Sequence, residues 1–487
     1  MAGATLFAAL VAAGTASAAT HHVAAAATRV NVSGATVGPP VAAGFVGLAT
    51  EYWNVEQEVG TDPKKPDLAF EQTLRNLAPQ GGFSLRIGGD STDWTWYPIP
   101  GMKQPAWVRW TMTPAWAEVT DKLVDDLGAH LIVGINMEAD SLKIASAEIQ
   151  EIRSAMGKVP TTFELGNEPE LYSHFPFYHD TAGQAVLGRP KTYSLADMTD
   201  QWNQMANALP NVRFAGPGYS SLNALPAVGQ FLADSRKLSL VTVHVYPLRS
   251  TRCSATKPQE DELFTTSSLQ VLASGLASWA RVADQHHVGL RVDEMNSVTC
   301  GGEPGLTNTF GPALWALNIL PLYAAAGVNG VNVQSRPSTA QNLIQTDQTR
   351  AGWRIHVQPE YYGLIAFSQL APPGSKMLTV GSMPSGLYAW ADRTPQGQTH
   401  VVVTNVGPGA STVAIPAKGA TGAAGVETLS GGSGGLSATG GVKLGGQTIS
   451  ALTGKLTGTP VSKSVVAKAN AYDITVAPDS AAIVTFK

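Results

Sequence analysis

Two glutamates stand in sequence contexts that suit acid–base and nucleophilic chemistry. Glu168 follows Asn167 in the segment FELGNEPELY, and Glu294 lies in the segment RVDEMNS. Each follows a short apolar run, which predicts that both lie at the ends of buried strands. Two carboxyl groups that face one cavity are the minimum for cleaving a glycosidic bond: one donates a proton to the leaving oxygen, and the other attacks the sugar carbon or activates water. The pair therefore indicates glycosidic chemistry, provided that the fold brings both residues together.

The middle of the chain alternates short apolar runs with amphipathic stretches, which is typical of parallel strands linked by helices. We expect eight strands, at residues 46–53, 83–89, 130–137, 161–167, 213–219, 240–247, 290–296 and 328–335. Helices are expected at residues 114–127, 141–156, 194–209, 267–286 and 312–326. Eight such units close into a (β/α)8 TIM barrel of the α/β class. A doubly wound open sheet is the alternative, but the segment GLATEYW lacks the Gly-rich turn usual after its first strand.

The composition changes from about residue 371, where Gly, Ala, Thr, Ser and Val dominate and helical periodicity ends. Short strand-like runs with turn residues between them predict an appended C-terminal β-sandwich domain. The segment ATRVNVSGATVGPPV near the N-terminus also looks strand-forming. We therefore expect a catalytic barrel over residues 43–370, a β-sandwich over 371–487, and a segment, 19–42, that adds strands to the sandwich.

The N-terminal residues 1–18 form a short apolar stretch that ends in a small-residue pattern, Ala16-Ser17-Ala18. This predicts a signal peptide and a secreted or periplasmic protein, with a plain Ala-rich tail as the alternative. No later segment has 18 uninterrupted apolar residues, so no membrane span is expected. In an oxidising compartment Cys253 and Cys300 could form a disulfide, the alternative being two free or buried thiols.

Charge and motif content exclude several classes of function. Charged residues make up 14% of the chain and the net charge is only −4, which argues against a nucleic-acid binder. The two cysteines lack the spacing of a zinc site. No metal, nucleotide or flavin motif is present, so neither a metal nor another cofactor is expected.

Further polar residues lie at the ends of other predicted strands, where a barrel gathers its functional side chains. They are Glu51 after the first strand, Arg86, Asp90 and Asp93 along the second, and His244 and Tyr246 in the sixth. Some of these have structural interpretations that are as strong as functional ones. Arg86 would suit a salt bridge beneath the site, Asp90 a turn, and His244 a satisfied position in the core.

Five segments together resemble glycoside hydrolase family 79, the β-glucuronidases and heparanases. They are RIGGDSTD, FELGNEPELY, YSLADMTDQWNQMANAL, VHVYP and DEMNSVTCGG, and the resemblance covers roughly residues 29–487. It implies a retaining enzyme that forms a covalent glycosyl-enzyme intermediate, with Glu168 as acid/base and Glu294 as nucleophile. The implied substrate is a β-D-glucuronide at the end of a glycan or glycoconjugate.

The same resemblance implies roles for other residues. Asn167 would bind the sugar 2-hydroxyl, Tyr246 would steady the nucleophile, and Glu51 and Asp93 would bind hydroxyls on the far side of the sugar. Arg336, in the segment VNVQSRPSTAQ after the eighth strand, is a candidate for the sugar carboxylate because its guanidinium is a bidentate fork.

Two alternatives stay open at this point. One is a β-glucosidase-like or endo-acting relative, since neither the sugar nor the aglycone follows from the sequence. The other is a carbohydrate-binding protein without catalysis, which is disfavoured because both glutamates are intact. The oligomeric state is also left open.

Overall fold

The computed structural model describes residues 27–157, 159–350, 352–417 and 422–487. The predicted signal peptide, residues 1–18, lies outside the described residues, as does the first part of the predicted 19–42 segment. Among the described residues, no helix has the length and apolar character needed to cross a membrane.

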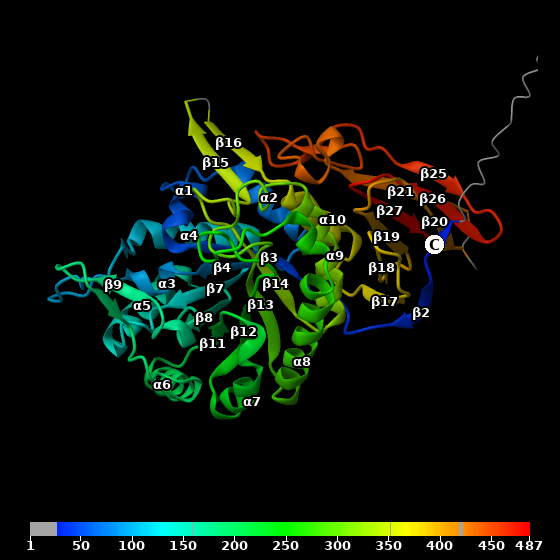
Figure 1. Cartoon of the computed structure of the whole chain (residues 1–487). Helices are drawn as coiled ribbons and strands as arrows, with labels where there is room; N and C mark the ends of the chain where they lie inside the picture. The colour runs from blue at the N-terminus through cyan, green and yellow to red at the C-terminus, as the bar shows by residue number, and fades with distance from the viewer. Residues whose placement is uncertain (1–26, 158, 351, 418–421) are drawn as a thin grey trace, which may run out of the picture.

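Eight parallel strands close into a barrel at the centre of the molecule (Figure 1). In chain order they are β3 (Val46–Glu51), β4 (Ser84–Gly88), β7 (His130–Ile135), β8 (Thr161–Leu165), β11 (Phe214–Tyr219), β12 (Leu238–Val245), β13 (Gly289–Met295) and β14 (Gly330–Gln334). The pairing of β14 with β3 completes the closure. The predicted (β/α)8 barrel is confirmed, with every strand end within about two residues of its predicted place, and the open-sheet alternative is excluded.

Helices surround the barrel and follow its strands. They are α1 (Val55–Val59), α2 (Leu68–Leu77), α3 (Ser91–Trp94), α4 (Pro114–Leu127), α5 (Leu142–Met156), α6 (Leu195–Ala208), α7 (Leu225–Asp234), α8 (Leu272–Gln285), α9 (Gly311–Ala325) and α10 (Glu360–Leu370). Side-chain caps fix four of the helix starts: Asp67 accepts from the Ala69 and Phe70 amides, Thr113 from the Trp116 amide and Ser141 from the Ile144 amide, and Ser194 forms a reciprocal capping box with Asp197. The five predicted helices are present; a π-helical turn, Ser267–Val271, precedes α8.

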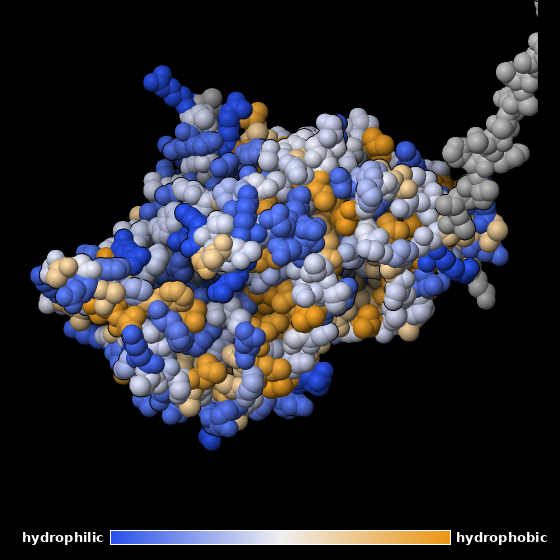
Figure 2. Space-filling model, viewed as in Figure 1, coloured by the Kyte–Doolittle hydropathy of each residue, from blue (hydrophilic) through white to orange (hydrophobic). Residues whose placement is uncertain are grey.

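The loops that follow the carboxyl ends of the barrel strands carry small elements of their own. These are the strand pairs β5 (Thr95–Trp96) with β6 (Trp110–Thr111), β9 (Pro176–His179) with β10 (Ala185–Leu187), and β15 (Ile344–Thr349) with β16 (Gly352–Val357), and the 3-10 turns Tyr52–Asn54, Pro169–Leu171, Leu222–Ala224 and Glu260–Phe264. The β15–β16 hairpin projects from the molecule in Figure 1, and Figure 2 shows that its projecting end is hydrophilic.

Beside the barrel, two further sheets combine strands from both ends of the described chain. A three-stranded sheet holds β1 (Thr28–Arg29), β20 (Ser411–Pro416) and β26 (Ala471–Val476). An eight-stranded sheet holds β2 (Val32–Thr36), β17 (Lys376–Val380), β18 (Leu387–Arg393), β19 (Thr399–Asn405), β27 (Ser480–Phe486), β21 (Ala423–Ser430), β22 (Lys443–Leu444) and β25 (Lys463–Val466). A short 3-10 turn, Gly432–Ser437, and the strand pair β23 (Thr448–Ile449) and β24 (Leu456–Thr457) complete this region.

One apolar core joins the two sheets. Val413 and Tyr472 from the three-stranded sheet pack in the same buried cluster as Val401 and Val484 from the eight-stranded sheet. β1 pairs with β20 and β2 with β17, so the segment before the barrel adds strands to the sheets that follow it. The predicted domain boundaries themselves stay predictions.

Candidate active site

The two glutamates lie at the carboxyl ends of the predicted strands. Glu294 is the penultimate residue of β13, and His244 of β12 lies directly opposite it in the register of the two strands. Glu168 follows β8, and its backbone is left-handed, with φ 48°. Its amide donates to the Gly218 carbonyl of β11 at 3.0 Å. This strained conformation, fixed by a neighbouring strand, turns the Glu168 side chain toward His244.

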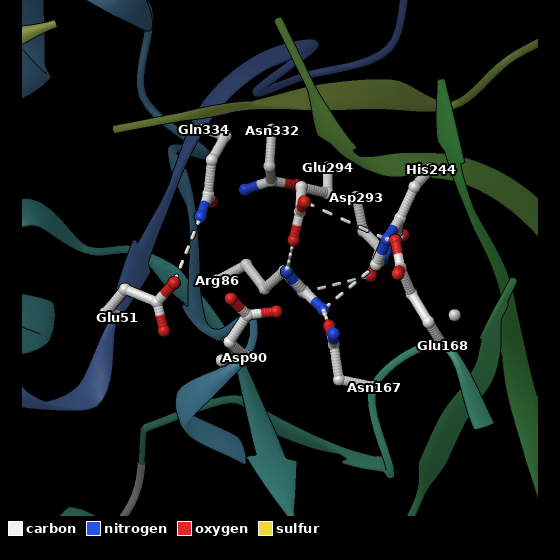
Figure 3. Close-up of polar contacts among 12 residues, drawn as sticks. Glu51, Arg86, Asp90, Asn167, Glu168, His244, Asp293, Glu294, Asn332 and Gln334 are labelled. Atoms are coloured by element: carbon white, nitrogen blue, oxygen red, sulfur yellow. Dashed lines mark hydrogen bonds and ion pairs between the residues drawn. The ribbon is translucent and has the colours of Figure 1, made fainter. Parts of the chain in front are cut away.

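Glu168, His244 and Glu294 meet in one small space (Figure 3). One oxygen of each carboxylate and one ring nitrogen of His244 all lie within 4.8 Å of one another. His244 Nδ1 lies 2.8 Å from Glu168 Oε1, and the Tyr246 hydroxyl donates to Glu294 Oε1 at 2.6 Å. Two carboxyl groups from distant parts of the chain therefore lie within 4.8 Å of each other, on either side of one gap.

Arg86 of β4 lies beneath this gap and is fully buried. Its guanidinium donates to Glu164 Oε2 at 2.8 Å, to Glu294 Oε2 at 2.7 Å and to Asn167 Oδ1 at 2.8 Å. Figure 3 shows its guanidinium between Glu294 and Asn167. The structural interpretation of Arg86, an internal salt bridge to one of the two glutamates, is the one that its contacts support. Arg86 thereby fixes the orientation of both Glu294 and Asn167.

A local irregularity lets two consecutive residues of β13 reach Arg86. Asp293 Oδ2 lies 3.1 Å from Arg86 Nε, although neighbouring residues in a strand normally point to opposite faces. The pairing of β13 with β14 shifts register between Val292 and Met295, as in a β-bulge. The shift re-aims the strand, so that both Asp293 and Glu294 face the barrel interior.

Two buried carboxyl groups below the site differ in charge state. Burial and the negative charge of Glu164 raise the pKa of Asp293 well above its usual range. Burial would also raise the pKa of Glu164, but the Arg86 charge outweighs it and lowers this pKa to about 2. These opposite shifts favour one shared proton, held on Asp293, so that the pair carries a single negative charge beneath the site.

The pKa values of Glu168 and Glu294 are shifted in opposite directions. Burial, joined by the charges of Glu294 and Asp90, raises the pKa of Glu168 against the opposing hydrogen bond from His244. Burial works the same way on Glu294, but His244, Arg86 and the Tyr246 hydroxyl together lower its pKa below the usual value. Environments that separate two carboxyl pKa values in this way assign one group as acid and the other as anion.

His244 holds a positive charge between the two glutamates. Burial opposes this charge, but the charge of Glu294 and the hydrogen bond with Glu168, joined by the negative charge that Asp293 shares with Glu164, outweigh it and raise the pKa of His244 to about 10. A protonated imidazole has no lone pair for a metal. Although Glu168, His244 and Glu294 have metal-like spacing, a protonated His244 pairs with the ionised Glu294 and donates a hydrogen bond to Glu168. His244 is thus a positioning residue, which contacts both Glu168 and Glu294.

Glu51 lies on the opposite side of Arg86 from Glu168, as Figure 3 shows. Its Oε2 accepts from the Ser91 amide at 2.9 Å, and Gln334 Nε2 lies 3.5 Å from its Oε1. The close approach depends on Gly89, since a Cβ there would come within 2.8 Å of Glu51 Oε1. Burial, followed by the charge of Asp90, raises the pKa of Glu51 to about 7. The Glu51 side chain is fully buried in this structure, so its role as a ligand of sugar hydroxyls stays a prediction.

Arg336, the candidate for a ligand carboxylate, is already paired. Its Nη1 donates to Asp90 Oδ2 at 2.9 Å, and its Nε lies 3.9 Å from Glu51 Oε1. Its side chain is 27% exposed, so its remaining donors can reach solvent. Asp90 is therefore an ion-pair partner at the pocket edge, and the wall formed by these three residues carries no excess positive charge.

Asp93 has a different environment from the one expected of a sugar ligand. It is 3% exposed, its Oδ1 accepts from the amides of Met137 and Glu138, and its Oδ2 accepts from the Asn167 amide and the Tyr172 hydroxyl. These bonds tie the end of β7 to the loop after β8. The contacts fit a positioning role for Asp93 better than the predicted contact with a hydroxyl.

A disulfide joins the loops after β12 and β13. Cys253 and Cys300 are paired, and the Thr299 amide donates to the Leu248 carbonyl close by. Because Tyr246 and Glu294 end the same two strands, the disulfide constrains the segments that follow two of the site's residues.

Comparison with known proteins gives two curated relatives. The chain is 24% identical over 323 residues to a β-glucuronidase of Aspergillus niger, which covers 59% of this chain and 57% of the relative. It is 23% identical over 440 residues to a β-glucuronidase of Neurospora crassa, covering 78% of this chain and 75% of that relative. The chain thus spans little more than half the length of the Aspergillus relative. No family model matches the sequence.

Among solved structures, the fold is similar to that of a 4-O-α-L-rhamnosyl-β-D-glucuronidase from Fusarium oxysporum. The TM-score is 0.70 at 17% identity, over 94% of this chain and 99% of that chain. At this identity the likeness concerns the fold. Taken together, the sequence and structural comparisons show that this chain is similar to glycoside hydrolases.

Proposed function

We propose that this chain is a retaining glycoside hydrolase that removes terminal β-D-glucuronides, with Glu168 as acid/base and Glu294 as nucleophile. The observation that carries the proposal is the spacing of these two side chains, which approach within 4.8 Å through one oxygen each. Retaining glycosidases place their carboxyl groups about 5–5.5 Å apart, whereas inverting enzymes need about 6.5–9.5 Å for a water molecule. The short gap favours direct attack by Glu294.

Double displacement assigns each step to one of these groups. Protonated Glu168 donates its proton to the glycosidic oxygen while Glu294 Oε attacks the anomeric carbon, which forms a glycosyl ester and releases the alcohol. The ester is neutral, so the repulsion that held the Glu168 proton falls. Glu168 then removes a proton from water as the water attacks the anomeric carbon, and Glu294 leaves as a carboxylate.

Neighbouring side chains support these steps. Tyr246 and Arg86 each donate to one oxygen of Glu294, which stabilises its anionic form before attack and orients it. Asn167 accepts from Arg86 through Oδ1, so its amide nitrogen is the end left to donate to a sugar 2-hydroxyl. Glu51 and Arg336 line the far wall, where we place the remaining hydroxyls and the 6-carboxylate of the sugar.

The choice of glucuronide rests on the relatives, both of which are β-glucuronidases. One observation favours a neutral sugar instead. Asp90 and Glu51 already pair with Arg336, so a sugar carboxylate would have to displace Asp90 or use the remaining guanidinium donors. A β-glucosidase-like activity is therefore the second candidate. The disulfide fits an oxidising compartment, which accords with a proposed secreted or periplasmic location.

Proton NMR of the first product tests the mechanism and the sugar together. We expect hydrolysis of 4-nitrophenyl β-D-glucuronide to release the β-anomer first, with the α-anomer appearing only through later mutarotation. Parallel assays with the matching glucoside, galactoside and xyloside rank the sugars by kcat/KM. First release of the α-anomer would rule out double displacement, and a glucoside preference would select the second candidate.

Activity is expected to follow a bell-shaped pH profile. The glycosylation step needs Glu294 ionised and Glu168 protonated, so kcat/KM should fall below the lowered pKa of Glu294 and above the raised pKa of Glu168. The two limbs should lie on opposite sides of the ordinary glutamate value of about 4.3. Glu168→Gln, assayed with a dinitrophenyl glycoside whose leaving group needs no acid, should lose the alkaline limb. Persistence of that limb would reassign it to another group.

A further inference from the structure

A second cavity lies at the outer rim of the barrel face that carries the candidate active site. It has a volume of about 440 Å³ and lies between the start of α5 and the side of α6. Its lining includes Asp140, Leu142, Arg189, Tyr193, Gln201 and Gln204. These residues follow the carboxyl ends of β7 and β8, so they belong to the loops and helices that continue from the catalytic face.

The polar groups of this cavity are held in a connected network. Gln201 Oε1 accepts from Arg189 Nε and from the Tyr193 hydroxyl, each at 2.7 Å, and Gln201 Nε2 donates to Asp140 Oδ1 at 2.8 Å. Arg189 is 7% exposed and also donates to the Met137, Glu138 and Gly188 carbonyls. These hydrogen bonds hold the polar side chains of the cavity wall in fixed orientations, as in preformed ligand sites.

The charge of this wall selects against ionic ligands. The Arg189 guanidinium donates to backbone carbonyls and to Gln201, and it lies over the rings of Tyr172 and Tyr193. These contacts leave it little capacity to bind an anionic ligand. Asp140 supplies one compensating negative charge and accepts from Gln201 through only one of its oxygens. What the cavity offers a ligand is the second Asp140 oxygen, the exposed Gln204 amide and the apolar surface of Leu142, which is 45% exposed.

This combination matches the chemistry of a neutral sugar, which presents hydroxyls around its edge and C–H groups on its face. A volume of 440 Å³ falls within the roughly 300–1,000 Å³ of small-molecule sites and has room for one or two sugar rings. We propose that this cavity is a second carbohydrate-binding site that holds a neutral segment of a glycan outside the catalytic pocket.

The cavity is also physically connected to the candidate active site. The carbonyls of Met137 and Glu138 accept from Arg189, while the amides of the same two residues donate to Asp93. Asp93 in turn accepts from the Asn167 amide, next to Glu168. The segment after β7 thus links Arg189 in the cavity wall to Asp93 and Asn167 beside Glu168, which suits a glycan that extends from the candidate active site toward this cavity.

Binding measured without turnover tests the proposal. The probes are neutral gluco-, xylo- and galacto-oligosaccharides of three to five residues, observed by saturation-transfer NMR with the full chain. We expect at least one of them to bind, and Gln204→Ala or Leu142→Ser to weaken that binding by about three- to tenfold, which is the loss that one hydrogen bond or one apolar contact contributes. Gln230→Ala, a change of the same type on the exposed side of α7, is the matched control and should bind normally.

Three outcomes would overturn the proposal. They are no binding by any probe, binding that Gln204→Ala and Leu142→Ser leave unchanged, and binding that a glucuronide competitor abolishes, which would place the sugar in the catalytic pocket. Thermal melting of each variant separates a lost site from a lost fold. The assay needs no hydrolysis, so a chain that cleaves no glucuronide could still bind the neutral oligosaccharides. The binding proposal and the proposed function can therefore be refuted independently of each other.

Discussion

Glu294→Gln is expected to abolish hydrolysis and leave the fold intact. The amide keeps the size of the side chain and can still accept from the Tyr246 hydroxyl, but it cannot form the glycosyl ester. Removal of a nucleophile from a catalytic unit lowers kcat by roughly 10⁴- to 10⁶-fold, and we expect a loss in this range. The measurement is the initial rate on the most active nitrophenyl glycoside, with thermal melting to confirm folding.

A matched substitution separates this effect from a general loss of charge. Glu118→Gln changes an exposed glutamate of α4 in the same way and should keep wild-type activity. Added azide provides a second readout, because a small anion can attack the anomeric carbon from the face that Glu294 occupied and yield the α-glycosyl azide. Activity of Glu294→Gln comparable to that of Glu118→Gln would remove Glu294 from the mechanism, and Asp293 would be the next carboxyl group to test.

The barrel could be predicted because its strands are short and apolar, and helical periodicity separates them. The helix prediction was incomplete: α2 and α7 were missed although each has a buried and an exposed side, and α10 was missed where burial erases the periodicity. α10 is buried along almost its whole length, so no polar face marks it as a helix, and it was not predicted. α9 is buried on all sides too, but the Pro at its second position gave a start signal.

The residues that face the gap could be predicted from the sequence, but of the charged residues beneath it only Arg86 was predicted. Glu168, Glu294 and Tyr246 follow apolar runs, so strand ends located them. Glu164 and Asp293 lie inside strands, and nothing in the sequence shows the register shift that turns Asp293 inward. Charged residues within otherwise apolar strands were the available signal, because a buried charge requires a partner.

The partner of those buried charges is Arg86, and Arg86→Met is expected to destabilise the fold severely. The methionine fills much of the space but leaves Glu164 and Glu294 without the cation that each contacts at 2.7–2.8 Å. Breaking a buried ion pair from one side costs about 3–5 kcal/mol, since the remaining charge stays desolvated. The free energy of unfolding should fall by that amount in urea titrations, and the pKa of Glu294 should rise because one of the groups that lowers it is gone.

The large loss of stability is expected because Arg86 is buried among carboxylates, and not because an arginine is lost. Arg75→Met removes an arginine that is 44% exposed from a single i,i+4 pair with Glu71, whose side chain is 5% exposed. Because one partly solvated contact is lost and not several buried ones, it should cost clearly less than Arg86→Met. Arg86→Lys keeps the charge but cannot donate to Glu164, Glu294 and Asn167 at once, so its loss of stability should lie between the two. If Arg86→Met unfolds at the same urea concentration as Arg75→Met, the buried carboxylates do not depend on this cation. The charge states derived for Glu164, Asp293 and Glu294 would then be wrong.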